Sequence, residues 1–350
     1  MIRRTQMNIS YANHGKQKTL DSIFEESRRV VNLYIEALWL QKNFASKFVD
    51  FKVETWLSAR LQQCLGKQAL EIVKSQRKKK KKTMPVFKSD VINLDSRFVD
   101  IQFNNNSFDV WFRLNSIGNK ISLNLPSKKH RHYFKYQNWT MKKSVRLSKF
   151  GDNYYIDLYF EKDSPEPKTD GKSIGLDCGY KKLLVSSENQ VYDTGLEKVY
   201  KKISRKKQGS IRFKKALVER DNKINQSVNQ IDIKNIKTVV VEDLKNVKHK
   251  SKGKLRKKFN NKLQRWSYSK VLNKLSRYCE ENAVSYFKIN PAYTSQTCNQ
   301  CGFKHRDNRS GEKFRCLNCG FSTDADYNAS LNILHRGVYS PSTTIKNENH

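Results

Sequence analysis

The sequence of 350 residues lacks any apolar run long enough to cross a membrane. Its first residues, MIRRTQMNISYANHG, are basic but contain no apolar core, so they do not predict a secretory signal peptide. No segment opposes a wholly basic helix face to an apolar one, which argues against binding to a membrane surface. We therefore expect a protein that is not secreted and binds no membrane, in the cytoplasm or associated with the nucleoid.

Acidic residues are scarce. There are 33 Asp and Glu against 69 Lys and Arg, which gives a formal net charge of +36. A charge this far from zero determines no fold, but it predicts a polyanionic partner. Because each phosphate contact releases counterions, we expect strong and steeply salt-dependent binding to nucleic acid.

Cysteine is also sparse, and four of the seven cysteines form two CxxC pairs. A loop of fourteen residues separates the pairs, and a glycine follows each pair, which is close to the usual spacing of a four-thiolate zinc site. The predicted ligands of one structural zinc ion are Cys298, Cys301, Cys316 and Cys319. His305 lies in the loop, but four thiolates complete a tetrahedron, so we expect it to be a bystander or a phosphate contact.

The other three cysteines, Cys64, Cys178 and Cys279, are scattered and odd in number. In a reducing compartment this pattern predicts small buried side chains and no disulfide.

Periodic apolar residues predict two helices in the first half of the chain, at 19–40 and about 54–74. The second helix ends in six cations, 77–82, which form either a solvated loop or a sequence-independent phosphate contact. From 91 to 162 apolar and polar residues alternate between turn sequences, which predicts antiparallel hairpins. Since these strands flank the helices, we predict a small β-barrel with a helical insertion.

A polar segment with two prolines, 163–172, predicts a linker between domains. Beyond it, the order strand, strand, helix, strand, helix, strand, helix over 173–336 predicts an α/β domain with a mixed sheet. Residues 200–230 are expected to form basic helix within that domain. The last residues, 337–350, have no apolar pattern and are expected to be disordered.

Three carboxylates lie on the predicted strands and the terminal helix of this α/β domain. Asp177 is on its first strand, Glu242 ends the strand TVVVEDL, and Asp326 begins the terminal helix. Each alone has an ordinary explanation: a turn for Asp177, a lysine partner for Glu242, and a helix cap formed by Thr323 or Asp324 near the third acid.

Together, the three acids indicate a metal site. Carboxylates that converge at a sheet edge repel one another, and divalent metal ions remove that repulsion. Two Mg²⁺ ions about 3.5–4 Å apart can activate a water and stabilise the leaving oxygen of a phosphodiester. We therefore predict a nuclease site in which Asp326 is the third ligand and Asp324 is the cap. The zinc knuckle would be an insertion just before the final helix.

Four sequence motifs carry a resemblance to a known family. GLDCG, VVVEDLKNV, NPAYTSQTCNQCG and DADYNASLNIL resemble, in the same order, the motifs of TnpB, a transposon-encoded RNA-guided DNA nuclease with a split RuvC domain. TnpB is related to type V CRISPR effectors. The resemblance covers 173–337. It implies that Asp177, Glu242 and Asp326 are catalytic and bind two Mg²⁺ ions, which Mn²⁺ can replace.

The resemblance also implies an α+β multidomain architecture. A wedge-type antiparallel β-barrel comprises 1–18 with 85–162, and a helical recognition insertion comprises 19–84. After a linker at 163–172, an RNase H-like (RuvC) α/β nuclease domain comprises 173–295 with 321–336. A zinc ribbon that binds target nucleic acid is inserted at 296–320, and a disordered tail follows at 337–350.

The implied partners are a guide (omega) RNA and double-stranded target DNA beside a short target-adjacent motif. The guide reads the target by base pairing while the protein holds the backbone of the heteroduplex. A companion transposase is expected to be encoded nearby without being a physical partner. The opening strand motif of the family is not found in 1–15, so no residue is assigned to the target-adjacent motif.

Candidate contacts with nucleic acid lie in three basic segments, where a solvated cationic surface is the alternative explanation. They are Arg77, Lys78, Lys79, Lys80, Arg205, Lys206, Lys207, Arg212, Lys214, Lys215, Lys254, Arg256 and Lys257.

Four alternative functions remain open from the sequence. A compact type V CRISPR effector is generally longer, and a neighbouring repeat array would identify it. A nuclease-silent RNA-guided DNA-binding regulator is disfavoured because all three acids are present. A simple zinc-ribbon RNA-binding protein leaves the acids unexplained. A protein-guided transposase with an RNase H-like core would need DNA-reading helices, and none is evident.

Overall fold

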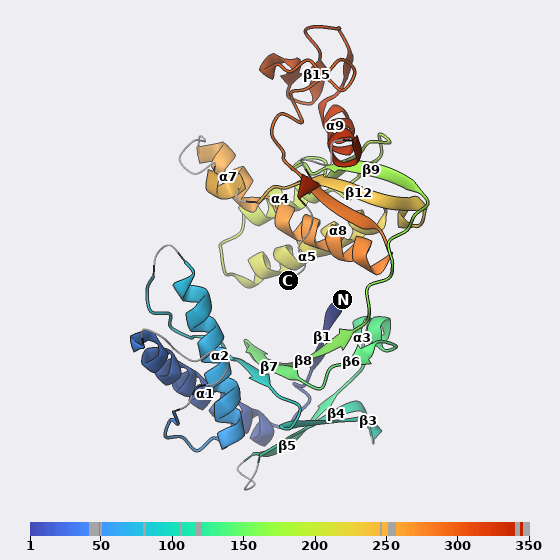
Figure 1. The fold of residues 1–350 in the computed structure, drawn as a ribbon. Coiled ribbons are helices and arrows are strands. Elements are labelled where there is room, and N and C mark those ends of the chain that lie inside the picture. The colour runs from blue at the N-terminus through green and yellow to red at the C-terminus, as the bar shows by residue number, and fades with distance from the viewer. Residues whose placement is uncertain are drawn as a thin grey trace. The chain divides into compact units, whose positions relative to one another are not determined.

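The computed structural model describes residues 1–41, 49, 51–79, 82–105, 107–116, 121–245, 247–250, 257–339 and 344–345. The chain divides into two compact units, Met1–Asp163 and Ser164–His350 (Figure 1). The division falls at the start of the segment predicted as a linker. Among the described residues, no helix has the length and apolar character needed to span a membrane.

Two long helices form part of the first unit. They are α1 (His14–Leu40) and α2 (Ala59–Arg77). Side-chain oxygens of Asn13 and Ser58 accept hydrogen bonds from backbone N–H groups of the first turns, so both helices begin at a polar cap. Helix α1 begins five residues before its predicted start because Asn13 caps it. Helix α2 begins five residues after its predicted start because Ser58 caps it.

The strands of the first unit form two separate antiparallel sheets. One contains, in spatial order, β1 (Ile2–Asn8), β8 (Asn153–Glu161), β7 (Val145–Phe150) and β2 (Val91–Leu94), with β6 (Thr140–Met141) also pairing with β8. The other contains β3 (Val99–Asn105), β4 (Phe108–Asn115) and β5 (Ser122–Ser127), and the short helix α3 (Arg131–Tyr136) follows it.

The predicted closed β-barrel is therefore wrong for the described strands. A barrel closes only when ladder hydrogen bonds join its edge strands. Here a side-chain hydrogen bond, from the Ser127 hydroxyl to the Asn8 carbonyl oxygen at 2.8 Å, links β5 to β1, and the described strands form no ladder between the two sheets. The alternation of apolar residues predicted the hairpins correctly, but it does not specify pairing between hairpins.

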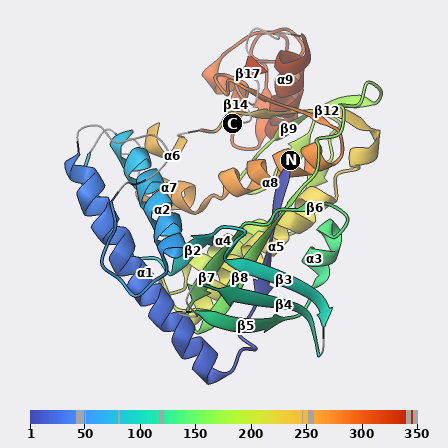
Figure 2. The same cartoon turned by 60° about the horizontal axis from the view of Figure 1, so that its bottom comes forward.

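The second unit has a mixed six-stranded sheet, as the element order predicted. Its spatial order is β11 (Val191–Tyr192), β10 (Leu184–Ser186), β9 (Lys172–Asp177), β12 (Ile236–Glu242), β13 (Ser285–Ile289) and β17 (Thr344–Ile345). Strands β9, β12 and β13 are parallel, and the other three pair antiparallel. Figure 2 gives a second view of this sheet.

Helices cover both faces of this sheet, because successive apolar side chains of β12 point to opposite faces. Val239 and Val241 belong to the apolar core shared with α4 (Leu196–Ser204), α5 (Ile211–Asn229) and α8 (Tyr268–Glu281). Val240 points the other way and packs with Ile333 of α9 (Ala325–Tyr339). Between β12 and α8 the chain forms α6 (Val247–Lys250) and α7 (Lys257–Arg265).

Two local features of the second unit differ in detail from the predictions. The basic region 200–230 is helical, as predicted, but it forms two helices, because Gly209 between them has a φ of +84°, a left-handed conformation that favours glycine. The predicted disordered tail is partly ordered: α9 continues to Tyr339, and β17 pairs with β13. Gly337 permits this extension of α9, since a Cβ atom there would lie 2.3 Å from Cγ1 of Val240. Residues 340–343 and 346–350 lie outside the described residues.

The cysteine pairs lie in a small three-stranded sheet before α9. Its strands are β14 (Arg309–Ser310), β15 (Lys313–Arg315) and β16 (Ser322–Asp324). Strand β16 leads directly into α9, so this sheet fixes the point at which the helix begins.

Candidate metal centres and carboxylate cluster

Two predicted acids end adjacent parallel strands. Leu176 of β9 pairs with Val241 of β12, so the next residues along the two strands, Asp177 and Glu242, are neighbours at the same sheet edge. Burial raises the pKa of Asp177 well above its usual range, and the charges of Glu242 and Asp326 raise it further. The structure therefore brings all three predicted carboxylates together.

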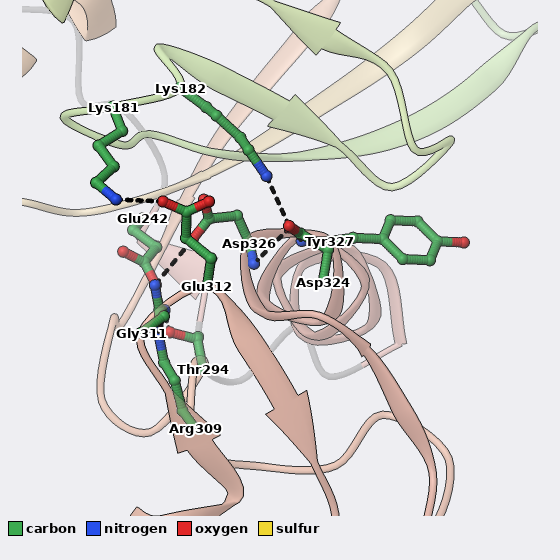
Figure 3. A network of polar contacts seen from close by, with 10 residues as sticks. All are labelled: Lys181, Lys182, Glu242, Thr294, Arg309, Gly311, Glu312, Asp324, Asp326 and Tyr327. Carbon is green, nitrogen blue, oxygen red and sulfur yellow. Dashed lines mark hydrogen bonds and ion pairs between the residues drawn. The ribbon is translucent and has the colours of Figure 1, made fainter.

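Thr294 holds Glu242 in place. The Thr294 hydroxyl donates a short hydrogen bond to the Glu242 carboxylate, and its side chain is buried (Figure 3). Burial raises the pKa of Glu242, while the Thr294 hydrogen bond and the charges of Arg336 and Arg309 oppose that rise. Thr294 belongs to the motif NPAYTSQTCNQCG, so this part of the motif positions the second acid.

We predict that metal-free protein becomes less stable as the pH rises. A carboxyl group whose folded-state pKa is raised contributes stability that is complete below its unfolded pKa and is lost as the pH rises through the folded pKa. Asp177 and Glu242 both have this sign of shift. Thermal unfolding in a chelator should therefore show a steeper fall in Tm for wild type than for Asp177→Asn as the pH rises above about 4, the ordinary pKa of these carboxyl groups. Parallel pH profiles would contradict this prediction.

Asp326 has a cationic partner that the sequence analysis did not identify. A guanidinium nitrogen of Arg309 donates to the Asp326 carboxylate (Figure 3), at 2.9 Å. The Asp326 side chain is 13% exposed. A second hydrogen bond, from Nε of Arg309 to the Gly311 carbonyl oxygen at 3.1 Å, anchors this arginine in β14. Arg309 is one of several cations in the loop between the cysteine pairs, and no sequence signal distinguishes it from its neighbours.

Asp324 caps helix α9, as predicted. Its carboxylate accepts hydrogen bonds from the backbone N–H groups of Asp326 at 3.0 Å and Tyr327 at 3.1 Å. Lys182 also donates to it, at 2.6 Å. Burial alone would raise the pKa of Asp324, but these hydrogen bonds lower it overall. Asp324 therefore fixes the first turn that presents Asp326, and a lysine already neutralises its charge.

Two buried asparagines fasten α9 to the segment that carries Thr294. The amide of Asn332 donates to the carbonyl oxygens of Thr294 at 2.8 Å and Thr297 at 2.7 Å. Asn328 donates to the Thr297 carbonyl oxygen at 2.9 Å and accepts from the Asn299 N–H at 3.1 Å. These contacts give a physical reason for both asparagines in the motif DADYNASLNIL.

Gly175 lets α9 approach β9 closely. A Cβ atom at position 175 would lie 2.2 Å from the Ser330 carbonyl oxygen and 2.6 Å from the Leu334 nitrogen, both in α9. Real Cβ atoms do not come this close to backbone atoms, so any larger residue must displace the helix. The glycine in the motif GLDCG thus sets the spacing between the element carrying Asp177 and the element carrying Asp326.

Gly175→Ala should therefore weaken both the fold and the carboxylate cluster. We expect a loss of about 1–3 kcal/mol in the free energy of unfolding, because the added methyl group overpacks the contact. Chemical denaturation measures this loss. Gly151→Ala is a control within the other unit: φ there is +61°, so alanine is strained, but the glycine has no atom within 4 Å of its Cβ position and no link to α9. Equal metal affinity of wild type and Gly175→Ala would argue against a role in spacing the acids.

The four predicted zinc ligands gather at one point. The Sγ atoms of Cys298 and Cys319 are 3.7 Å apart, and those of Cys301 and Cys316 are 3.6 Å apart. All four sulfur atoms lie within 4.8 Å of one another. A tetrahedral zinc site with Zn–S bonds of about 2.3 Å requires sulfur atoms about 3.8 Å apart. The donor set and its spacing therefore fit a bound metal ion, and they exclude a disulfide between these pairs.

The pKa values of the cysteines differ within the cluster. The backbone N–H of Phe303 lowers the pKa of Cys301 to about 6, which favours the thiolate that binds metal. The Phe321 N–H also lowers the pKa of Cys319, but hydrogen bonds with the other three cysteines outweigh it and raise that pKa to about 12, as expected when four sulfur atoms share protons without a metal ion. His305 is exposed and instead accepts a hydrogen bond from the Asp307 N–H, so it lies outside the four-sulfur group. Cys178 and Cys279 are buried and Cys64 is half-buried, and all three are free.

The carboxylates do not form a comparably compact group. Among the described residues, only the four cysteines bring three or more metal-ligating atoms within 4.8 Å of one another. Asp177, Glu242 and Asp326 interact electrostatically but are more widely spaced, with Arg309 on the third of them. Their oxygen donors are the type that Mg²⁺ prefers.

The predicted nucleic-acid contacts have different structural settings. Arg77 donates to the carbonyl oxygens of Leu38, Trp39 and Gln41, so it ties the end of α2 to the end of α1. Lys78 caps α2, and Lys79 donates to the Gln76 side chain. Six others lie on or between α4 and α5, and these stay predictions: Arg205, Lys206, Lys207, Arg212, Lys214 and Lys215. Lys80, Lys254 and Arg256 lie outside the described residues, and for Lys257 only the backbone is described.

Comparison with known proteins finds similarity to proteins that are named as nucleases. Residues 268–333 match the family described as Cas12f1-like, TNB domain. The endodeoxyribonuclease Cas12f1 of Sulfoacidibacillus thermotolerans is 38% identical over 97 residues, which cover 27% of this chain and 21% of that protein. The putative RNA-guided DNA endonuclease InsQ of Escherichia coli (strain K12) is 28% identical over 231 residues, 56% of each chain. Other matches are named TnpB-like proteins.

These findings confirm the resemblance to the TnpB family. The chain is a relative of proteins named TnpB-like, InsQ and Cas12f1. It covers less than two thirds of the length of the two curated relatives described above. A cryo-EM structure of a Cas12f1–sgRNA–target DNA complex aligns with 97% of this chain and 100% of its own, at 19% identity and a TM-score of 0.38, which is too low to support a structural argument.

Proposed function

We propose that this protein is an RNA-guided DNA endonuclease that hydrolyses phosphodiester bonds with the help of divalent metal ions. The observation that carries the proposal is the meeting of Asp177, Glu242 and Asp326 at one sheet edge in a strongly basic chain. The names of the relatives, endodeoxyribonuclease and RNA-guided DNA endonuclease, support the same reaction.

The three carboxylates would hold two Mg²⁺ ions, or Mn²⁺ in their place. Bound there, the ions would supply an activated water and stabilisation of the leaving oxygen. Thr294 orients Glu242 through its hydrogen bond, and the Asp324 cap orients the first turn that carries Asp326. Arg309 offers a guanidinium group beside Asp326, where it can bind a phosphate oxygen of the substrate.

The four cysteines would bind one structural zinc ion and so hold the start of α9. Phe314 and Cys316 are buried together with Ala325, the first residue of the helix, so the ribbon core and the helix start are one packed unit. We infer that the ribbon positions Asp326 and contacts target nucleic acid. The RuvC-type nuclease domain would comprise 173–295 with 321–336, and the wedge and recognition segments would comprise 1–162.

A cleavage assay with defined guides tests this function. The full chain, loaded with a guide RNA bearing a chosen segment, is given double-stranded DNA that either matches or does not match that segment. We expect cleavage only of matched DNA, only beside a particular short flanking sequence, and only with Mg²⁺ or Mn²⁺. Cutting of both targets, or of neither across a library of flanking sequences, would contradict a guided nuclease.

A further inference from the structure

A cavity in the second unit is lined by positive charge. Its volume is about 550 Å³, within the usual range of ligand sites, and α4, α5, α6, α7 and α8 contribute to its wall. The five cations that line it are Lys206, Arg220, Lys248, Arg265 and Lys270, and the lining contains no carboxylate. This arrangement predicts an anionic ligand.

A second hollow continues the first along α4. Its volume is about 310 Å³, and the residues that line it are all cations: Lys198, Lys201, Lys202, Arg205 and Lys206. Lys206 lines both hollows. A ligand with two or more anionic groups could therefore occupy both hollows at once, as successive phosphates of a nucleic-acid strand would.

Acidic neighbours neutralise only part of this charge. Asp221 pairs with Arg220 at 2.6 Å and with Lys270. Glu197 and Glu219 pair with two lysines of the second hollow. Within the part of the chain that the structure describes, Lys206 and Arg265 have no ion-pair partner. Burial and the charge of Arg220 lower the pKa of Lys248, so like charges lie close together at the cavity wall.

The cavity also has features suited to a nucleic-acid base. Trp266 and Phe213 line it, and both are half-buried. The indole N–H of Trp266 donates to the Gly179 carbonyl oxygen at 3.0 Å, which fixes the orientation of the ring. Amide side chains of Gln208, Asn261 and Gln264 stand nearby and can hydrogen-bond the edge of a base. Aromatic rings beside cations are the usual means of binding unpaired nucleotides.

We propose that this cavity binds one unpaired nucleotide of a single-stranded nucleic acid, with the adjoining phosphates in the second hollow. The proposal deepens the proposed function, on which it rests, by assigning a single-strand site apart from the carboxylate cluster. Both RNA and DNA strands present this chemistry, and the experiment below distinguishes them.

A matched pair of double variants tests the site. Lys206→Ala/Arg265→Ala removes two charges from the cavity, whereas Lys172→Ala/Lys234→Ala removes two exposed charges of the same unit that line neither hollow. The full chain, freed of bound nucleic acid by high salt, is titrated with labelled single-stranded RNA, single-stranded DNA and duplex DNA of equal length. We expect the cavity variant to lose at least about tenfold in affinity for one single strand and little for duplex, while the control variant changes little.

Two results would overturn this site. Equal losses in both variants, or equal losses for single strands and duplex, would mean that net charge alone binds nucleic acid. The single strand, RNA or DNA, for which the cavity variant loses more affinity is the strand that the cavity binds. Photo-crosslinking of wild-type protein to a 4-thiouridine RNA and a 4-thiothymidine DNA is an independent check that needs no variant: crosslinks should map to peptides containing Phe213 or Trp266, and their absence from both peptides would reject the cavity.

The outcomes also separate this proposal from the proposed function. A cavity variant with unchanged single-strand affinity and normal guided cleavage would reject the nucleotide site alone. If the cavity variant loses single-strand affinity but the wild-type chain cuts no matched DNA, the result would instead reject the proposed nuclease function and keep the nucleotide site.

Discussion

Asp177→Asn should abolish Mg²⁺-dependent DNA cleavage, with a rate at least about 10³-fold below wild type, while leaving affinity for nucleic acid nearly unchanged. Asparagine keeps the size of the side chain but removes the charge that would hold a metal ion. Asp177 interacts electrostatically with both Glu242 and Asp326, so we expect its loss to disrupt the proposed metal site. Binding should persist because the substitution leaves unchanged the cations that we expect to contact phosphate.

The same substitution should stabilise the metal-free protein at neutral and higher pH. It removes a buried negative charge that two other carboxylates repel. Loss of cleavage together with gain of apo stability cannot result from unfolding. Asp243→Asn, one residue beyond Glu242, is the control: its carboxylate accepts from the Lys245 N–H at 3.1 Å and it should cut DNA normally. Cutting by Asp177→Asn at the wild-type rate would refute the catalytic assignment.

Cys316→Ser should abolish binding of the proposed zinc ion and unfold the module at 296–322. Structural metal binding and folding are coupled, and the binding free energy of such sites is on the order of 10 kcal/mol. Cys316 is buried beside Phe314 and Ala325, so loss of the metal should loosen the start of α9 as well as the ribbon. Native mass spectrometry measures the metal content, and proteolysis between the cysteine pairs reports the unfolding.

Cleavage should fall with the metal in this variant, because Arg309 and Asp326 both depend on the ribbon for their positions. Cys64→Ser is the control: this half-buried thiol is far from the cluster in sequence and belongs to the other unit, so zinc should be retained. One zinc ion per chain in Cys316→Ser would show that the four-sulfur site is not the metal site. Normal cleavage by a variant without zinc would show that cleavage does not require the zinc-bound ribbon.

The carboxylate cluster could be predicted because each acid has a sequence context that specifies its place. Asp177 and Glu242 end apolar runs that form adjacent parallel strands, and two residues after Asp324 the helix presents Asp326. The cysteine spacing likewise predicted the four-sulfur group that the structure contains.

Other features depend on contacts between residues far apart in the sequence. The separation of the first-unit strands into two sheets depends on pairing between hairpins, and strand patterning carries no information on that pairing. The partnership of Arg309 with Asp326 depends on how the ribbon folds back onto α9. Arg77 belongs to a run that looks like a phosphate contact, yet its hydrogen bonds to three carbonyl oxygens join two helices.

The most direct test of an RNA-guided nuclease is the RNA that the protein carries. The chain is purified from cells that hold its native flanking DNA, washed at high salt, and the retained RNA is sequenced. We expect a single discrete species with a structured scaffold and a variable 3′ segment, which would then define the DNA target. A mixture of unrelated cellular RNAs would contradict guide binding and would favour a zinc-ribbon RNA-binding protein whose net charge of +36 alone accounts for the association.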